Sequence, residues 1–474
     1  MLLITLGRMA QFFLMFAAIK LSTALLAPAE MAKVYLVTSI VSFYSMLLIN
    51  PVGMFMNRRF HAWNDQGRIN PYFGYFWLYL LVVCVAAVAS LQVVVATGLV
   101  DLHVSGVWIA VLVGGSLLVA SANQVVIPGL NLLNHRGWFV VLTLATVGSG
   151  LATALLLVLW VGPRAEMWIS GLLTGQFIFA AVGWRVFAAR LQQTQHTPKP
   201  GRPHVVALAS FALPISLAVG LGWLQSQGYR FMMETQLGMH ALGLFVAGYG
   251  ISSGLISAFE MLLTTYLHPI FYRHISNESE IEQSRAWRDY AGTMFPSLLL
   301  MGCFIYATAP ELTRVLLGSA YQSSFEFVAW GVIAELARVV SATYGMVAHA
   351  RMRTRLLLVP GVVGAALSIA LNWWLMPRYE SHGVGTALAL SALVVCTLTY
   401  AVTHKVFETS IPYRPLLISA VVGVGLIAMA DGLRWSTGYD DAWTPTLARL
   451  GTVGLACVFL QYLLLRPLWR KPIA

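Results

Sequence analysis

The sequence predicts an all-α polytopic membrane protein with about fourteen transmembrane helices. Of the 474 residues, 58% are hydrophobic and only 10% are charged, whereas a soluble domain carries about 25% charged residues. The apolar residues gather in about fourteen stretches from Leu2 to Leu465, and about 20 such residues cross a bilayer as a helix. No polar stretch between them is long enough for a separate soluble domain.

Prolines, glycines and charged residues separate the apolar stretches and mark where each helix is expected to end. We predict spans over residues 2–26, 31–56, 72–98, 106–133, 138–161, 167–189, 206–232, 241–268, 291–309, 326–349, 355–376, 383–404, 412–431 and 446–465.

The loops between these spans indicate the orientation of the chain. Loops on one side, with the C-terminal tail, carry 19 Lys and Arg residues. Loops on the other side carry only Lys33, Arg164, Arg314, Arg378, Arg434 and Arg449. Because cytoplasmic loops are enriched in Lys and Arg, the sequence predicts that both termini are cytoplasmic. The net charge of +11 therefore reflects the orientation of the chain in the membrane. Nucleic acid is not expected as a partner.

The polar, proline-containing segment 190–205 is the expected cytoplasmic linker between two halves. It would separate an N-terminal six-helix lobe, 1–189, from a C-terminal six-helix lobe, 206–404. Residues 405–474 would add a transmembrane hairpin and a cytoplasmic tail. Fifteen residues lead from Lys20 to the Tyr of AKVYLV and from Arg230 to the Phe of LGLFVA. This spacing is weak internal symmetry of the kind that transporters show.

Three segments carry a resemblance to a known family. They are the seventh and eighth spans, LPISLAVGLGWLQSQGYRFMMETQLGMHALGLFVAGYG, then LLGSAYQSSFEFVAW, then LNWWLMPRYESHGVGTALALS. In order and spacing the chain resembles an oligosaccharide flippase of the multidrug/oligosaccharidyl-lipid/polysaccharide exporter superfamily. One departure is Tyr229, which stands where the family has an Asp before the arginine.

The resemblance implies two six-helix lobes in a V around a central cationic cavity, with the C-terminal hairpin outside them. The cargo would be a polyprenyl-pyrophosphate-linked oligosaccharide for a cell-surface polysaccharide such as O-antigen or exopolysaccharide. The protein would lie in the bacterial inner membrane, contact membrane lipids, and work with a polysaccharide polymerase and glycosyltransferases.

Cations inside the spans are the first candidate substrate-binding residues: Arg8, Lys20 and Arg230. A charge inside a span costs about 2.5–3.5 kcal/mol on insertion scales, so it usually faces a partner or an aqueous cavity. A guanidinium matches the oxygens of a pyrophosphate. The alternative is that these long side chains snorkel to the membrane surface.

Further candidates lie at the cytoplasmic mouth and along the helices. Arg58 and Arg59 can capture the diphosphate or attract anionic lipid. Gln225 and Gln227 can bind sugar hydroxyls or bridge helices. Three further amide side chains within the spans can likewise bind sugar hydroxyls or bridge helices: Asn123, Gln124 and Gln176.

The candidate coupling or gating residues are Glu260, Glu335 and Arg338. Glu260 has no cation within a helical turn, so we expect an isolated carboxylate that exchanges a proton, or one that pairs with Arg8 or another cavity cation. Glu335 and Arg338 are three residues apart and are expected to neutralise each other on one helix face.

The sequence leaves three classes of function to compare. A lipid-linked oligosaccharide flippase suits the cations of the spans. A drug/cation antiporter of the same superfamily would prefer an acidic cavity. A membrane-embedded polymerase or acyltransferase needs a catalytic group on a surface loop, and no such group is evident. The chain has no P-loop motif and no Cys/His cluster, so no cofactor or metal is expected.

Overall fold

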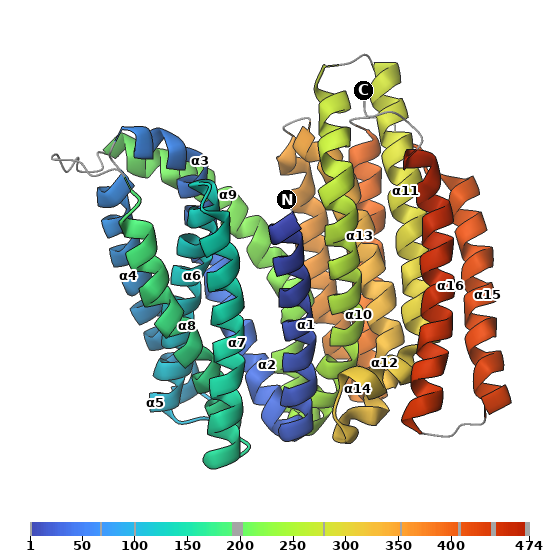
Figure 1. Ribbon diagram of the computed structural model, residues 1–474, viewed down its shortest axis with the longest axis horizontal. Coiled ribbons are helices and arrows are strands. Elements are labelled where there is room, and N and C mark those ends of the chain that lie inside the picture. Colours follow the sequence, from blue (N-terminus) through green and yellow to red (C-terminus); the bar gives the residue numbers. More distant parts are fainter. Residues whose placement is uncertain are drawn as a thin grey trace. The chain divides into compact units, whose positions relative to one another are not determined.

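The computed structural model describes residues 2–66, 69–98, 101–191, 202–277, 280–350, 353–405, 409–437 and 442–469. Throughout these ranges the regular structure is helical (Figure 1). Ten of the described helical segments are long and apolar enough to cross a membrane. The chain is therefore an all-α, multi-pass membrane protein, as the sequence predicts.

The number of passes also agrees with the sequence. Two of the ten segments, Val206–Arg273 and Arg355–His404, are 68 and 50 residues long, and each contains two passes. Helices α1 (Leu2–Leu25) and α13 (Val328–Ala350) supply two more. The described helices thus account for about fourteen passes.

The chain divides into two compact units. The N-terminal unit comprises Met1–Trp223 with Leu237–Gly243, and the C-terminal unit comprises Leu224–Gln236 with Leu244–Ala474. The predicted linker, 190–205, lies largely outside the described residues. The division into functional lobes, the V arrangement and the central cavity stay predictions.

The N-terminal unit contains α1 and most of the helices that follow it, up to α9. Their bounds are α2 (Pro28–Tyr44), η1 (Ser45–Ile49), α3 (Asn50–Asp65), α4 (Ile69–Ala96), α5 (Gly106–Ile109), η2 (Ala110–Gly114), α6 (Gly115–Leu132), α7 (Arg136–Trp160), α8 (Ala165–Ala188) and α9 (Arg202–Gln227). η1 and η2 are π-helical turns inside longer helices.

The C-terminal unit contains most of the remaining helices. Their bounds are α10 (Tyr229–Asn277), α11 (Glu280–Ala307), α12 (Ala309–Leu316), η3 (Ser319–Phe327), α13, η4 (Thr354–Leu357), α14 (Leu358–His404), α15 (Tyr413–Thr437) and α16 (Trp443–Trp469). α10 is interrupted at Gly238 and α14 at Glu380, where the backbone is not helical. Both residues have positive φ, 82° and 48°, a conformation that glycine adopts readily and other residues adopt at a cost.

Small residues let α7 and α8 pack closely in the N-terminal unit (Figure 1). A Cβ atom added at Gly171 would lie 2.2 Å from the Cα of Ala154, and one at Gly175 would lie 2.3 Å from the nitrogen of Gly150. Each helix therefore presents two small residues four positions apart, the pattern that brings membrane helices into backbone contact. Thr153 strengthens the contact by donating to the carbonyl of Gly171 at 2.6 Å.

The C-terminal hairpin, α15 and α16, packs on α11 (Figure 1). Its apolar core is formed by Leu300, Ala307, Leu426, Ala430, Val453 and Cys457. The amide of Gln461 also donates to the carbonyl of Ser297 at 2.8 Å. The hairpin is thus joined to the C-terminal unit by apolar and polar contacts.

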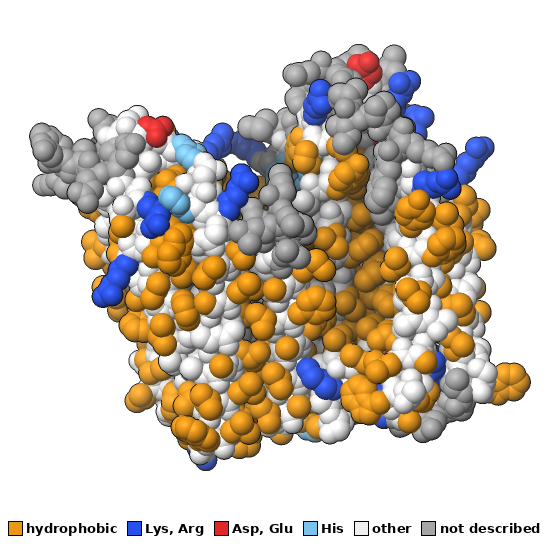
Figure 2. Space-filling view, viewed as in Figure 1, with side chains coloured by type: hydrophobic (Ala, Val, Ile, Leu, Met, Phe, Trp, Pro, Cys, Tyr) orange, Lys and Arg blue, Asp and Glu red, His pale blue; other side chains and the backbone are white. Residues whose placement is uncertain are grey.

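The outer surface is that of a protein surrounded by lipid. On the face drawn in Figure 2, hydrophobic side chains cover the middle of the helices, and Lys and Arg lie mainly toward helix ends. Large apolar side chains are widely exposed, among them Trp435 at 86%, Val107 at 76% and Leu455 at 74%. Soluble proteins rarely expose apolar patches of this extent, so the surface itself indicates a membrane environment.

Candidate functional site

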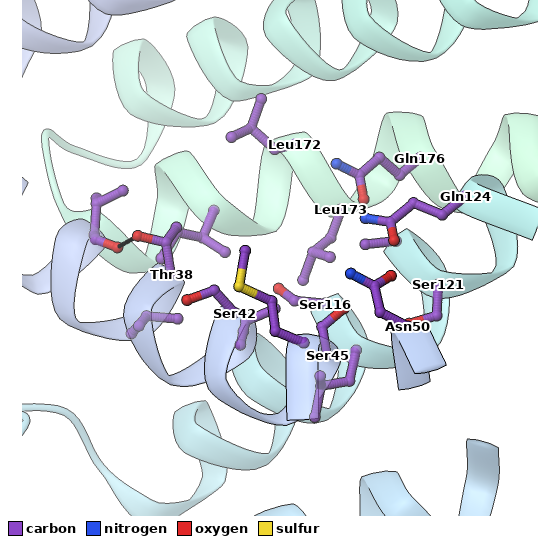
Figure 3. Close-up of a pocket in the computed structure, with 17 residues that line it drawn as sticks. Thr38, Ser42, Ser45, Asn50, Ser116, Ser121, Gln124, Leu172, Leu173 and Gln176 are labelled. Atoms are coloured by element: carbon purple, nitrogen blue, oxygen red, sulfur yellow. Dashed lines mark hydrogen bonds between the residues drawn. The ribbon is translucent and has the colours of Figure 1, made fainter. Parts of the chain in front are cut away.

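A polar pocket lies inside the N-terminal unit, between α2, η1, α3, α6 and α8 (Figure 3). Its volume is about 310 Å³. The figure draws 17 lining residues, and eight of these carry a hydroxyl or an amide: Thr38, Ser42, Ser45, Asn50, Ser116, Ser121, Gln124 and Gln176. The others are apolar, so no charged side chain is among these lining residues.

Contacts at the start of α2 hold that helix against α8 and so form one wall of the pocket. The carboxylate of Glu30 accepts the backbone N–H of Ala165, the first residue of α8, at 2.8 Å. A carboxylate at a helix N-terminus satisfies a backbone donor that the helix leaves open. Lys33 lies 2.7 Å from the other oxygen of Glu30 and balances its charge.

The amide groups gather at one end of the pocket. Figure 3 shows the side chains of Gln124, Gln176 and Asn50 close to one another, with Thr38 and Ser42 toward the other end. Behind them, Asn123 donates to the backbone carbonyl of Gln176 at 2.9 Å. The buried side-chain oxygens of Asn123 and Gln176 have no hydrogen-bond partner among the described residues. A buried polar atom in this state normally meets water or a ligand.

One π-helical turn lines this pocket, and a second lies close to it in the sequence. η1 contributes Ser45 and Met46 to the lining, and η2 ends at Gly114, two residues before the lining residue Ser116. π-helical turns are rare and occur frequently at functional sites. The backbone irregularity and the polar side chains therefore coincide in one place.

A second polar site, the charged triad of Glu260, Glu335 and Arg338, lies in the C-terminal unit. The Nε of Arg338 lies 2.6 Å from Glu335 Oε2, and its Nη2 lies 2.9 Å from Glu260 Oε2. Ser257 accepts from the same guanidinium at 3.3 Å, and the hydroxyl of Tyr249 donates to Glu335 at 3.3 Å. Arg338 therefore connects α10 to α13.

The triad corrects one expectation and agrees with another. Glu260 is not an isolated carboxylate, because Arg338 supplies its cation from 78 residues away in the sequence. Among the described side chains, the cation that pairs with Glu260 is Arg338. The pair between Glu335 and Arg338 is present as the spacing predicts.

The charges of the triad do not balance. Two carboxylates share one guanidinium, so the group carries a net charge of −1 when all three side chains are ionised. The side chain of Glu335 is only 10% exposed and that of Glu260 22%, whereas Arg338 is 43% exposed. Desolvating such charges is costly unless they are paired, so the pairing with Arg338 offsets this cost for both carboxylates.

The predicted cationic residues are placed as follows. Lys20 in α1 and Arg230 at the start of α10 are half-buried, and each makes contacts within the structure. They belong to different units. Arg58 is exposed, and the guanidinium of Arg59 lies 4.7 Å from the ring centre of Phe55. The side chain of Arg8 lies outside the described residues.

The two predicted glutamines are at the end of α9. Gln225 and Gln227 are both half-buried. The backbone carbonyl of Gln225 accepts from Ser368 of α14 at 3.0 Å, which ties this end of α9 to the C-terminal unit. The substrate-binding roles of these residues and of the cations stay predictions.

A further charged network escaped sequence analysis. Arg434 of α15 forms ion pairs with Glu311 of α12 and with Asp431, and Arg449 of α16 lies 3.7 Å from the same Glu311. Both arginines were counted among the loop cations. α15 extends past the predicted span 412–431 and includes Arg434, and Arg449 lies within α16 as well as within the predicted span 446–465. The available signal was the spacing of Asp431 and Arg434, three residues apart on a helix.

Solved structures of membrane transporters share this fold. The lipid II flippase MurJ, in an inward closed conformation, matches with a TM-score of 0.72 and 12% identity, over 99% of this chain and 100% of that chain. A multidrug resistance MATE family transporter of the MOP superfamily matches in its inward-facing conformation with a TM-score of 0.66 and 12% identity, over 83% of this chain and 93% of that chain. The outward-facing conformation of such a transporter matches with a TM-score of 0.57 and 12% identity, over 85% and 93%.

The sequence comparisons add nothing to this likeness. No protein-family model matches the chain, and no curated protein matches it.

Proposed function

We propose that this protein is a transporter that moves a polyprenyl-pyrophosphate-linked oligosaccharide from the cytoplasmic to the outer leaflet by alternating access. The observation that carries the proposal is the match to a lipid II flippase over 99% of this chain and 100% of that one. The match therefore includes the C-terminal hairpin. MATE transporters match over 83% and 85% of this chain, which leaves uncovered a part about the size of residues 405–474.

The cations of the predicted spans support an anionic cargo. Arg8, Lys20 and Arg230 lie within or at the ends of predicted spans. A pyrophosphate would gain charge-assisted hydrogen bonds from these side chains, while the polyprenyl tail stays in the surrounding lipid. Arg58 and Arg59 would attract the headgroup from the cytoplasm.

We place the coupling step at the charged triad. Protonation of Glu260 or Glu335 would weaken the pairing with Arg338 and loosen the connection between α10 and α13. A conformational equilibrium moves only if the two states differ in interaction energy, and this pairing supplies such a difference. The triad would therefore link the occupancy of a proton or cation to the shape of the C-terminal unit.

One observation favours drug or cation antiport as a second candidate. The triad carries a net negative charge, and MATE transporters share the fold with TM-scores of 0.66 and 0.57. A cationic drug would seek such a site. The lining of the N-terminal pocket, which includes no carboxylate, offers such a drug no second anionic group.

Transport in proteoliposomes separates the two candidates. The purified protein would receive a fluorescent short-chain polyprenyl pyrophosphate that carries an oligosaccharide, and a membrane-impermeant quencher would report how much has changed leaflet. A parallel assay would follow efflux of a cationic dye under a pH gradient. The proposal requires faster flipping than in protein-free liposomes and no dye efflux. Dye efflux without flipping would favour the antiporter.

The setting of the transporter is part of the proposal. We place the protein in the bacterial inner membrane with both termini in the cytoplasm, alongside a polysaccharide polymerase and glycosyltransferases. Reporter fusions after Trp469 and within the connection between α15 and α16 should report cytoplasmic and external locations respectively. Two reports from the same side would contradict this topology.

A further inference from the structure

We infer that the polar pocket of the N-terminal unit is a binding site for an uncharged, hydroxyl-rich group, namely a sugar ring. With the proposed function as its premise, this inference assigns the sugar portion of the cargo to a site separate from the cationic residues. The site lies wholly within one unit, so its geometry is set by α2, η1, α3, α6 and α8 of that unit.

The chemistry of the lining fits a sugar. Each of the eight polar lining residues can both donate and accept hydrogen bonds, and a sugar hydroxyl does the same. The apolar lining residues, such as Val41 and Leu172, offer surfaces for the C–H face of a ring. Small-molecule sites commonly combine an apolar wall with a few convergent polar groups.

The same lining argues against other occupants. A cation or an anion would leave water without a countercharge among the lining residues, and that cost is high. A lipid tail would cover eight polar side chains with hydrocarbon and leave their polar atoms without new partners. The volume of about 310 Å³ is at the lower end of the ~300–1,000 Å³ range of small-molecule sites, which suits one or two sugar rings.

An unsatisfied acceptor identifies where the sugar would bind. The side-chain oxygen of Gln176 is buried and lacks a hydrogen-bond donor among the described residues. Gln124 and Asn50 lie beside it (Figure 3). A sugar hydroxyl that donates to Gln176 and accepts from a neighbouring amide would satisfy this end of the pocket.

Replacing the two glutamines tests the site. Gln124→Met and Gln176→Met keep the length of the side chain and remove its hydrogen bonds. Gln92→Met is the matched control, because Gln92 lies in the same unit and bonds only weakly, at 3.3 Å, to the carbonyl of Gly106. Saturation-transfer NMR on the purified protein would measure binding of glucose, galactose, N-acetylglucosamine and their disaccharides.

The wild type and Gln92→Met should bind at least one of these sugars, and the two pocket variants should bind it about five to ten times more weakly. The inference is overturned if the wild type binds none of the sugars, or if the pocket variants bind as the wild type does. Circular dichroism and gel filtration would establish that each variant is folded before binding is compared.

A flipping assay distinguishes failure of this inference from failure of the proposed function. Wild-type protein would be offered the lipid-linked oligosaccharide and the bare polyprenyl pyrophosphate. The pocket variants should lose the preference for the sugar-bearing lipid and still flip the bare lipid. If the wild type flips neither lipid yet binds sugar, the proposed function fails and the sugar site stands. If it flips both equally and the variants do the same, the sugar site fails alone.

Discussion

Arg434 of α15 meets Glu311 of α12 through two contacts, from Nε to Oε1 at 3.0 Å and from Nη2 to Oε2 at 2.6 Å. The side chain of Glu311 is only 5% exposed and that of Arg434 15%. Arg449 of α16 approaches the same carboxylate. One buried acid thus joins both helices of the C-terminal hairpin to α12.

Removal of this acid should destabilise the hairpin. Glu311→Ala leaves two arginines in a buried position without their carboxylate, and breaking a buried pair in this way costs about 3–5 kcal/mol. We expect a clearly lower temperature of thermal unfolding in detergent. Asp431→Asn is the control, because Asp431 is 65% exposed and an exposed pair contributes about 0–1 kcal/mol. Equal melting of the two variants would contradict this account.

Glu260 and Arg338 should be energetically coupled. We would measure the unfolding of Glu260→Gln, Arg338→Gln and the double variant. Because the two side chains touch, the double variant should be less destabilised than the sum of the singles, by about 0.5–3 kcal/mol. Arg378→Gln is the matched arginine control, since Arg378 bonds to a backbone carbonyl of its own helix. Additive effects of Glu260→Gln and Arg338→Gln would show that the contact does not contribute to the free energy of unfolding.

Glu260→Gln also tests the coupling role. The amide keeps the shape of the side chain and cannot exchange a proton. If protonation of Glu260 drives the cycle, flipping by this variant should no longer respond to a pH gradient across the proteoliposome membrane. The wild type measured with and without the gradient is the reference. A variant that keeps the full response to the gradient would remove Glu260 from the coupling mechanism.

The close packing of α7 on α8 predicts a sharp difference between two glycines. Gly171→Ala would place a methyl group against the backbone of Ala154, and overpacking of this kind costs about 1–3 kcal/mol. Gly148→Ala has no neighbouring atom within 4 Å of its added carbon, so it should be neutral or stabilising. Expression level and thermal unfolding would compare them. Similar behaviour of the two variants would mean that the helices separate easily.

Arg8 is predicted to bind the diphosphate. Arg8→Ala should reduce flipping about tenfold or more, because a hydrogen bond to a charged group contributes about 1.5–3 kcal/mol. Arg8→Lys should restore only part of the rate, since the ammonium lacks the planar fork of donors. Met9→Ala, at an exposed neighbouring position, is the control for insertion of α1. Full flipping by Arg8→Ala would leave Arg8 as a snorkelling residue.

The helices were predictable from the sequence because hydropathy is a local property. The spans expected at 138–161 and 167–189 coincide closely with α7 and α8. The ends were less accurate where a charged residue continues the helix. The predicted span 412–431 stops before Arg434, whereas α15 continues to Thr437, because Glu311, which is distant in the sequence, balances the charge of Arg434.

The sites were only partly predictable because they depend on contacts between distant helices. The pair of Glu335 and Arg338 follows from a spacing of three, whereas the contact of Arg338 with Glu260 has no signal in local sequence. The hydroxyls of Thr38, Ser42 and Ser45 recur at helical spacing, and this pattern could have indicated one wall of the N-terminal pocket. Gln124 and Gln176 were considered as sugar ligands, but nothing local placed them together.

The π-helical turn η1 has a consequence for how the second span tolerates insertions and deletions. In an unbroken α-helix, each residue advances by about 100°, so Ile49 would follow Thr38, Ser42 and Ser45 on one face, and Asn50 would point about 120° away from Thr38. The wider turn at Ser45–Ile49 absorbs one extra residue, and Asn50 lines the pocket instead. Deleting one residue from this turn would therefore restore a regular α-helix in which Asn50 still faces the pocket, on the same face as Thr38 and Ser42. The second span can thus lose a residue at this turn and keep its amide at the pocket wall.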